Sequence, residues 1–332
     1  MSRDEATLSR LLQTLSSGDY HSGDELGQRL GISRAAVWKQ LQKLGELGVE
    51  LESVRGKGYR LKGGLELLER DCLWAGLSDL TRARLTELDV LSVTDSTNSQ
   101  AMQRAARGQS GYVCLAEQQT AGRGRRGRTW VSPFGRNLYL SVSWGFDGGA
   151  AQLEGLSLAV GVAMCQVLEA EGVKSVGLKW PNDVLWQQRK LAGVLLEMTG
   201  DPAGACQVVV GVGLNLAMPG SPALDIEQPW ADLETVCAAE HCPMPGRNAL
   251  AARLIDALVG LLSSYHLEGF SAWRDDWLAR DAFAGRRVVI SSGARTEEGI
   301  ARGVDINGAL MLEQAGERIL CHGGELSMRA VS

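Results

Sequence analysis

Apolar positions recur at helical spacing at the start of the chain. Ser22 and Ser33 each precede a further apolar run, and a serine in that position caps the free N–H groups of a helix. The segments on either side of Gly56-Lys57-Gly58 predict a short hairpin. Three helices followed by a hairpin describe a winged helix-turn-helix, which we assign to residues 1–64. The first predicted helix has the apolar stripe Leu8, Leu11, Leu12 and Leu15.

Strand-like and helix-like patterns then alternate over residues 65–282, which predicts a central α/β domain. Lys62-Gly63-Gly64 before it predicts a linker. The stretch 218–230 holds three prolines and no clear period, so it is predicted to be a loop. The predicted strands are Val113–Glu117, Leu138–Trp144, Gly177–Trp180 and Gln207–Asn215, and the predicted helices are Leu153–Glu171, Arg247–Tyr265 and Phe270–Arg280.

Residues 283–332 consist of short β-type segments separated by turns. Asn307-Gly308 is a hairpin turn signal between two of them. About 50 residues with this pattern of short β-type segments and turns predict a small β-barrel. The chain is therefore predicted to be a multidomain α+β protein with boundaries at 1–64, 65–282 and 283–332.

Composition is that of a globular protein, with 45% apolar and 22% charged residues and a formal net charge of −5. The longest apolar stretch, 156–168, is too short to span a membrane. The seven cysteines form no C-x-x-C pair, and His241 between Cys237 and Cys242 is too little for zinc, so no metal site is predicted. The start of the chain shows no secretory signal, and we expect a cytoplasmic protein with reduced thiols.

The N-terminal module is basic, although the net charge of the whole chain is negative. Residues 1–64 carry ten Lys and Arg against eight Asp and Glu, and the predicted helix 33–44 carries three basic residues and no acid. A helix laid in the major groove with a basic wing on the phosphates needs this distribution. The first turn of that helix is placed to reach base edges, and the lysines to reach phosphates. The DNA-binding candidates are Ser33, Arg34, Trp38, Lys39, Gln42, Lys43 and Lys57.

Two alternatives stay open for this module. A winged helix can also serve only for packing or for protein interaction. Trp38 lies on the polar face of its predicted helix, where it could contact a thymine methyl group or pack on the neighbouring domain.

A second concentration of positive charge lies in a segment rich in arginine and glycine. Gly122-Arg-Gly-Arg-Arg-Gly fits the dinucleotide pattern G-x-G-x-x-G, but that pattern must open a helix, and Pro133 and β-forming residues follow here. Four arginines within six residues, alternating with glycines, suit a loop that wraps around phosphate or carboxylate oxygens. We interpret the segment as a nucleotide-binding flap between two strands. A solvated basic loop or a nucleic-acid patch is the alternative.

Five motifs occur in a characteristic order: Asp95-Ser-Thr-Asn98, Gln119–Trp130, Lys179-Trp-Pro-Asn-Asp183, Arg189-Lys-Leu-Ala-Gly193 and Gly211-Val-Gly-Leu-Asn215. In this order and spacing the chain resembles biotin–protein ligases. The winged helix resembles that of the bifunctional bacterial type, which also represses the biotin operon. The resemblance covers nearly the whole chain and implies a mixed sheet in the central domain and an SH3-like barrel at the C-terminus.

The resemblance also implies two half-reactions. The carboxylate of biotin attacks the α-phosphate of ATP in the presence of Mg²⁺, which gives biotinyl-5′-AMP and pyrophosphate. A lysine of a biotin carboxyl carrier domain of acetyl-CoA carboxylase then takes the biotin. The same adenylate acts as co-repressor and promotes a homodimer that binds operator DNA with two half-sites. No membrane partner is implied.

The matched motifs imply the biotin-binding residues. Hydroxyl and amide groups can satisfy the donors and the acceptor of the buried ureido ring. Ser96 or Thr97 would equally well cap the predicted helix 98–106, and both roles can hold. Cationic groups stabilise the charge that develops when a carboxylate meets a triphosphate, and a glycine between them allows close approach. The residues concerned are Ser96, Thr97, Asn98, Gln119, Arg123, Gly124, Arg125 and Lys190.

The remaining motif residues are implied for the adenylate and the catalytic steps. Trp130 offers a face for adenine, although a tryptophan can as well belong to the core. Asn182 and Asn215 lie where strands end and could bind the adenylate or form turns. Asp183 could bind Mg²⁺ or take a proton from the incoming lysine. Lys190 by spacing alone would be a solvent-exposed lysine after the turn at Gln187-Gln188, and the resemblance places it, with Arg125 and Asp183, among the catalytic residues.

Three other functions stay open. A winged helix joined to a binding domain could be a biotin-responsive regulator without catalysis. The chain could also be a ligase whose N-terminal module no longer binds DNA. A lipoate-attaching enzyme fits poorly, because neither the arginine–glycine flap nor the basic winged helix is expected there.

Overall fold

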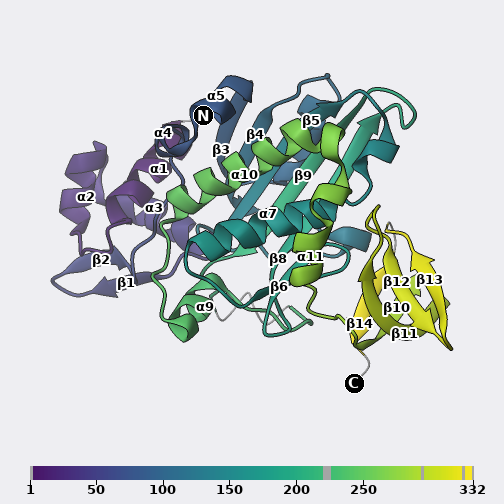
Figure 1. Ribbon diagram of the computed structural model, residues 1–332. Coiled ribbons are helices and arrows are strands. Elements are labelled where there is room, and N and C mark those ends of the chain that lie inside the picture. Colours follow the sequence, from purple (N-terminus) through teal and green to yellow (C-terminus); the bar gives the residue numbers. More distant parts are fainter. Residues whose placement is uncertain (1–2, 220–225, 293–294, 324–325, 331–332) are drawn as a thin grey trace.

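The computed structural model describes residues 3–219, 226–292, 295–323 and 326–330 (Figure 1). Residues 220–225 of the predicted loop, and the first two residues of the chain, lie outside this part. Helical and short hairpin elements come first, a large sheet with helices follows, and a second sheet ends the chain. This order is the predicted one, and the domain boundaries themselves stay predictions.

The N-terminal elements form the predicted winged helix. Ser22 Oγ accepts the N–H of Glu25 at 3.1 Å, and Ser33 Oγ accepts the N–H of Ala36 at 3.2 Å, so both predicted caps are formed. Gly31 ends the second helix in the left-handed conformation that glycine favours (φ 68°). The elements are α1 (Arg3–Leu15), α2 (Gly23–Leu30), α3 (Arg34–Glu46), β1 (Leu51–Val54) and β2 (Gly58–Leu61).

The central sheet has seven strands in the order β3-β4-β5-β9-β8-β7-β6. Only β3 and β4 run parallel within the described sheet, so the predicted mixed sheet is confirmed. The strands are β3 (Glu87–Thr94), β4 (Tyr112–Gln119), β5 (Asn137–Phe146), β6 (Val176–Lys179), β7 (Asp183–Trp186), β8 (Arg189–Gly200) and β9 (Cys206–Asn215).

Helices cover both faces of this sheet. Side chains of β4 alternate: Val113 and Leu115 join the large core beneath the helices α7 (Leu156–Ala170) and α10 (Arg247–Glu268), as Figure 1 shows. Tyr112 and Cys114 point to the other face, where α6 (Thr97–Ala105) packs. The sheet is therefore buried between two layers, and its strand ends are left to form a site.

Several predicted elements differ in extent from those observed. The helix predicted from Leu153 begins at Leu156, after a short 3₁₀ turn, and the helix predicted over 270–280 is divided into η3 (Phe270–Ala272) and α11 (Arg274–Ala279). The sequence patterns predict the turn at Gln187-Gln188 but not the strands β7 and β8 on either side of it, nor the edge strand β3 and three short helices. These helices are α4 (Arg70–Gly76), α5 (Asp79–Arg84) and α9 (Leu233–Glu240).

The C-terminal strands form a five-stranded antiparallel sheet in the order β13-β12-β11-β10-β14. Trp180 Nε1, at the end of β6, donates to the carbonyl of Gly308 at 3.1 Å, which ties this sheet to the central domain. In the described part of the sheet no pairing joins β13 to β14, so the predicted barrel closure stays a prediction. The strands are β10 (Arg287–Ser292), β11 (Arg295–Val304), β12 (Leu310–Gln314), β13 (Glu317–Cys321) and β14 (Ser327–Ala330).

Two segments, Ala150–Ala170 and Arg247–Glu268, are long and apolar enough to cross a membrane by length and composition alone. Each has 56% of its most apolar window buried inside the protein, and both pack on the central sheet. They are therefore core helices of the fold. All seven cysteines are free thiols, as expected.

Candidate functional site

A pocket of about 950 Å³ opens at one end of the central sheet. The start of α6, the end of β4, the flap after it, the β6–β7 turn and the ends of β8 and β9 all contribute to its wall. Every residue predicted to bind biotin or the adenylate, or to act in catalysis, lines it: Ser96, Thr97, Asn98, Gln119, Arg123, Gly124, Arg125, Trp130, Asn182, Asp183, Lys190 and Asn215. Residues as far apart in sequence as 96 and 215 are therefore brought to one site.

A buried hydrogen-bond network forms one end of the pocket. Gln119 Oε1 accepts the N–H of Thr97 at 2.9 Å, so Gln119 caps α6, and the predicted capping by the side chain of Ser96 or Thr97 is not formed. Ser141 Oγ lies 2.8 Å from Thr97 Oγ1 and 2.6 Å from Asn98 Oδ1. A Cβ on Gly211 would lie 2.0 Å from Asn98 Oδ1, so only glycine fits there. This end is polar and closely packed.

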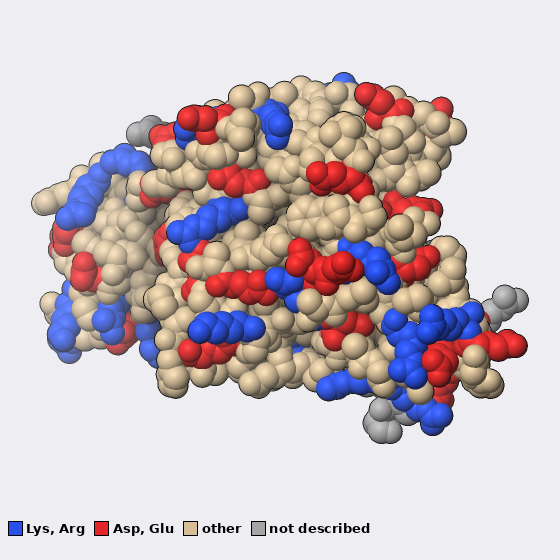
Figure 2. Space-filling model, viewed as in Figure 1, with Lys and Arg blue, Asp and Glu red and all other residues tan. Residues whose placement is uncertain are grey.

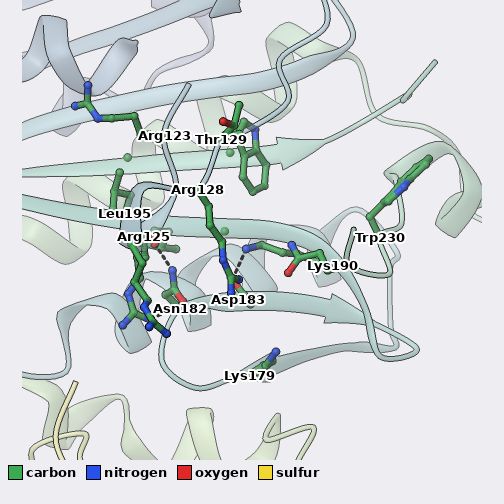
Figure 3. Close-up of a pocket in the computed structure, with 18 of the residues that line it drawn as sticks. Arg123, Arg125, Arg128, Thr129, Lys179, Asn182, Asp183, Lys190, Leu195 and Trp230 are labelled. Atoms are coloured by element: carbon green, nitrogen blue, oxygen red, sulfur yellow. Dashed lines mark hydrogen bonds and ion pairs between the residues drawn. The ribbon is translucent and has the colours of Figure 1, made fainter. Parts of the chain in front are cut away.

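The flap is a tight hairpin. Gly124 N–H donates to the carbonyl of Arg128 at 2.7 Å, and Trp130 N–H donates to the carbonyl of Gly122 at 2.9 Å. It joins β4 to β5, as predicted. Figure 3 shows Arg125 reaching down from it into the pocket, whereas Arg123 points the other way.

The two arginines have different partners. Arg125 donates to Asn182 Oδ1 at 3.2 Å and to the carbonyl of Leu326 in the C-terminal segment at 2.9 Å. Burial lowers the pKa of the Arg125 guanidinium, and the charge of Asp183 opposes that shift. Arg123 pairs with Glu197 at 3.1 Å. The C-terminal segment thus contacts the flap directly.

An ion pair lies in the middle of the pocket. Lys190 Nζ is 2.6 Å from Asp183 Oδ1, and the two side chains are only 17% and 14% exposed. Lys190 follows the β7–β8 turn, in which Gln187 and Gln188 have positive φ, but it is not the solvent-exposed lysine that its spacing suggested. Its Nζ also lies 5.3 Å from the centre of the Trp130 ring.

Trp130 packs flat against the backbone of two strands. A Cβ added to Gly213 would lie 2.5 Å from its ring, and one added to Gly193 would lie 3.2 Å from it. The indole Nε1 is buried and has no hydrogen-bond partner among the described residues. Trp130 is therefore both packed and part of the pocket wall, so the two readings of this residue are compatible.

The two asparagines are held by backbone groups. Asn182 Nδ2 donates to the carbonyl of Val194 at 2.6 Å, which leaves its Oδ1 to Arg125. Asn215 Nδ2 donates to the carbonyl of Ala231 at 3.1 Å, just past the predicted loop. Each side chain is thereby fixed at a strand end.

The predicted DNA-binding residues lie on one exposed face of α3 and on the hairpin. Trp38 is 54% exposed, and Val37 on the opposite face is buried in the module's core. Lys43 is the exception, since its Nζ lies 2.5 Å from Asp4 Oδ2 in α1. The exposed residues of the set are Ser33, Arg34, Trp38, Lys39, Gln42 and Lys57.

Comparison with known proteins agrees with this geometry. Residues 90–215 match the model of the biotin/lipoate A/B protein ligase family, and residues 7–60 match a helix-turn-helix domain. A bifunctional ligase/repressor of Salmonella typhimurium is 43% identical over 96% of this chain and 97% of its own length. The chain belongs to the family of bifunctional biotin ligase/repressors.

Other family members support this membership. The biotin–[acetyl-CoA-carboxylase] ligase of Paracoccus denitrificans is 35% identical over 70% of this chain and 96% of its own length. A biotin protein ligase from Aquifex aeolicus, solved in complex with biotin and ATP, superposes with a TM-score of 0.64. It is 24% identical and covers 74% of this chain and all of its own, which shows that the two share a fold.

The pocket of this ligase/repressor also contains residues to which the sequence reasoning gave no individual role. Arg128, Lys179 and Trp230 are among its lining residues and are labelled in Figure 3. Ser141 and Glu197 complete the polar end by hydrogen bonds to Asn98. Lys179 belongs to a quoted motif, whereas Ser141 carries no sequence signal beyond its place in a strand.

Proposed function

We propose that this protein is an ATP-dependent biotin–protein ligase that also represses transcription of the biotin operon. It forms biotinyl-5′-AMP and pyrophosphate from biotin and ATP, and transfers biotin to a lysine of a biotin carboxyl carrier domain. One observation carries the proposal: every predicted ligand-binding residue lines a single pocket. The exposed basic face of α3 supports the repressor activity.

The first half-reaction joins two anions. A carboxylate oxygen of biotin bonds to the α-phosphorus as the bond from that phosphorus to the bridging oxygen breaks. Arg125 and Lys190 stabilise the charge on the carboxylate and the α-phosphate, and their partners Asn182 and Asp183 hold them in place. Arg123, held by Glu197, and Gly124 shape the flap over the biotin.

The polar end of the pocket fits the ureido ring of biotin. Thr97, Asn98 and Gln119 bring hydroxyl and amide groups together there, and Ser96 lies beside them at the start of α6. These groups can donate to the ureido oxygen and accept from its N–H groups. Trp130 on the sheet, with Asn215 near it, is proposed to border the adenylate.

The second half-reaction requires loss of a proton from the incoming lysine. We propose that Asp183 accepts it, because its carboxylate is mostly buried and lies at the centre of the pocket. AMP leaves with the electron pair of the acyl–phosphate bond. No product of the first step other than the adenylate is needed.

The donor set is compatible with Mg²⁺ that arrives with ATP. Mg²⁺ commonly keeps several waters and is held by one or two carboxylates together with substrate phosphates. Asp183 supplies one such carboxylate, and the part of the chain that is described holds no cluster of three metal-ligating side chains. Bound Mg²⁺ would neutralise part of the triphosphate charge.

Finer features complete the proposal. The acceptor is the carrier domain of acetyl-CoA carboxylase, and the adenylate promotes a homodimer that places two α3 helices on operator DNA. The protein acts in the cytoplasm, which its free thiols and charged surface support. The five C-terminal strands close into a small SH3-like barrel beside the pocket.

Incubation with labelled biotin, ATP, Mg²⁺ and a purified carrier domain tests the ligase. We expect label on the carrier domain only when ATP is present. Binding of biotin without any transfer would instead identify a regulator without catalysis. A gel-shift with biotin-operon DNA, with and without biotin and ATP, tests the repressor, and transfer without any shift would identify a ligase whose winged helix does not bind DNA.

A further inference from the structure

The carboxylate of Glu197 connects the polar end of the pocket with the flap. Glu197 lies on β8, and its Oε2 accepts a hydrogen bond from Asn98 Nδ2 at 2.8 Å. The same oxygen lies 3.1 Å from Nη2 of Arg123, which Figure 3 shows turned away from Asp183 and Lys190. A carboxylate paired with an arginine carries no proton. Glu197 can therefore only accept hydrogen bonds.

This carboxylate fixes the orientation of the buried Asn98 amide. The Nδ2 end of Asn98 has to face Glu197, because only that end of the amide can donate a hydrogen bond. The Oδ1 end then faces Ser141 Oγ at 2.6 Å and accepts the proton of that hydroxyl group. Ser141 has a single hydroxyl proton, so it has none left for another acceptor.

The direction of the hydrogen bonds is passed on to Thr97. Its Oγ1 lies 2.8 Å from Ser141 Oγ, and two hydroxyl oxygens at this distance share a proton. Because the Ser141 proton goes to Asn98, Thr97 donates its own proton to Ser141. The contact between Thr97 Oγ1 and Gln119 Oε1, at 3.2 Å, is then left without a proton.

Two acceptor oxygens therefore lie side by side in the wall of the pocket. The orientation of Gln119 is fixed separately, since its Oε1 accepts the backbone N–H of Thr97 at 2.9 Å and its Nε2 donates to Ser132 Oγ at 3.2 Å. Neighbouring oxygens with no proton between them repel each other. A ligand that brings an N–H group to Thr97 Oγ1 and Gln119 Oε1 would relieve this repulsion.

We propose that Glu197 is a positioning residue that makes the polar end of the pocket select ligands with an N–H donor. Glu197 does not line the pocket and acts through Asn98, Ser141 and Thr97. The inference rests on the proposed ligase function, in which the donor is a ureido N–H of biotin. If the Asn98 amide were reversed, each donor in this chain would become an acceptor and Thr97 would offer its proton to the ligand. The negative charge of Glu197 excludes that reversed state, because Asn98 Oδ1 would then face a carboxylate.

The test measures ligand selectivity by calorimetry. Biotin is compared with two cyclic carbamate analogues, in each of which one ureido N–H is replaced by an oxygen atom. We expect the wild-type protein to bind at least one analogue about 100-fold more weakly than biotin, because its oxygen would face two acceptors. In Glu197→Gln the new amide can also donate to Asn98, so the chain can reverse and this ratio should fall at least about tenfold. A role in folding alone would weaken binding of all three ligands alike and leave the ratio unchanged.

Two further variants complete this test. Ser141→Ala interrupts the chain while Glu197 stays in place, which frees the Thr97 proton, so the ratio should fall in the same way even if Glu197→Gln does not fold. Asp147→Asn removes the charge of an exposed residue outside the pocket and should leave the ratio unchanged. The same ratio in all four proteins would overturn the proposal.

Neutron diffraction separates this proposal from the proposed function. Crystals of the ligand-free protein in D₂O show the deuterium atoms directly, so the order of the hydrogen bonds is tested without ligand or turnover. We expect the Asn98 Nδ2 deuterons to face Glu197 and the Thr97 hydroxyl deuteron to face Ser141. A Thr97 deuteron directed at Gln119 would contradict the proposal. A wild-type protein that binds no biotin would count against the proposed function instead, whatever the order of the deuterons.

Discussion

At the residue scale, the buried ion pair of Lys190 and Asp183 lies at the centre of the proposed reaction. Lys190 neutralises a carboxylate that would otherwise repel both anionic substrates. We expect Lys190→Ala to reduce adenylate formation about 10²- to 10³-fold, as for removal of one charge-stabilising donor. Radiolabelled biotin and ATP under single-turnover conditions measure it.

Arg189→Ala is the matched control for this variant. Arg189 is the neighbouring residue of β8, but its guanidinium lies 4.4 Å from the Trp186 ring and it does not line the pocket. Its loss is expected to leave adenylate formation within about twofold, because a partly exposed side chain outside the pocket contributes little. Near-normal activity of Lys190→Ala would remove the role given to that lysine.

A second prediction at this scale concerns Gly213, against which the Trp130 ring packs. In Gly213→Ala the new methyl group would displace the ring, so we expect at least tenfold weaker binding of biotinyl-5′-AMP, which corresponds to about 1.4 kcal/mol. Gly260→Ala is the control, since no atom lies near its added Cβ in α10. Unchanged affinity, measured by calorimetry, would show that the ring does not border the ligand.

The sequence predicts the residues of this site that carry reactive or charged groups better than the residues that hold those groups in place. Charged and hydroxyl groups stand in recognisable motifs, so they can be named before the fold is known. Ser141 and Gly211 cannot, because their roles arise from strand pairing: they lie directly opposite each other on β5 and β9, beneath Asn98. Local patterns carry no information on which strands become neighbours.

At the element scale, the flap connects the pocket with the winged helix. Trp130 lies on the sheet, and Phe134, four residues later, is 4% exposed within the apolar cluster of α1, α2 and α3. A Cβ on Gly135 would lie 2.8 Å from the side chain of Leu65, so the two chain segments are in close contact. A change in the position of the flap would therefore also shift residues that pack against the winged helix.

We expect Phe134→Ala to destabilise the winged helix by about 3–5 kcal/mol, the usual cost of removing a buried phenyl ring. Because the same segment carries the flap, affinity for biotinyl-5′-AMP should fall in parallel. Thermal unfolding and ligand titration measure the two effects. Phe134→Leu, which keeps most of the volume, should lose much less of both. A loss of stability without any change in ligand affinity would show that the flap is positioned independently.

Local sequence patterns predict some helices and strands correctly and leave others unassigned. Serine caps and apolar stripes place α2 and α3 correctly because both are local properties. The strand β8 is not predicted because Ala192 and Gly193, near its start, are poor strand formers whose place is decided by pairing with β7 and β9. In the edge strand β3 the alternation of polar and apolar residues shifts by one position between Val90 and Leu91, and two positions near its end are exposed.

At the scale of the whole molecule, the net charge of −5 is unevenly distributed. Residues 65–282 carry 18 basic and 25 acidic residues, while residues 1–64 have an excess of two basic ones. Figure 2 shows Lys and Arg gathered over the β1–β2 hairpin and again on the C-terminal sheet, with acidic side chains across the helices between them. The acidic charge of the central domain is expected to repel DNA, so we expect the DNA contact to be made by the winged helix.

This distribution leads to a last prediction, for binding to biotin-operon DNA. Affinity should rise when biotin and ATP are added, and its logarithm should fall linearly with the logarithm of salt concentration, because phosphate contacts release counter-ions. Lys57→Ala should weaken binding to all sequences and reduce that slope by about 1 for each winged helix that contacts DNA. Trp38→Ala, which removes an exposed apolar side chain from α3, should lower the preference for the operator and keep the slope. A slope that Lys57→Ala leaves unchanged would mean that the hairpin does not touch the phosphates, and an affinity indifferent to biotin and ATP would mean that the ligase pocket does not control the repressor.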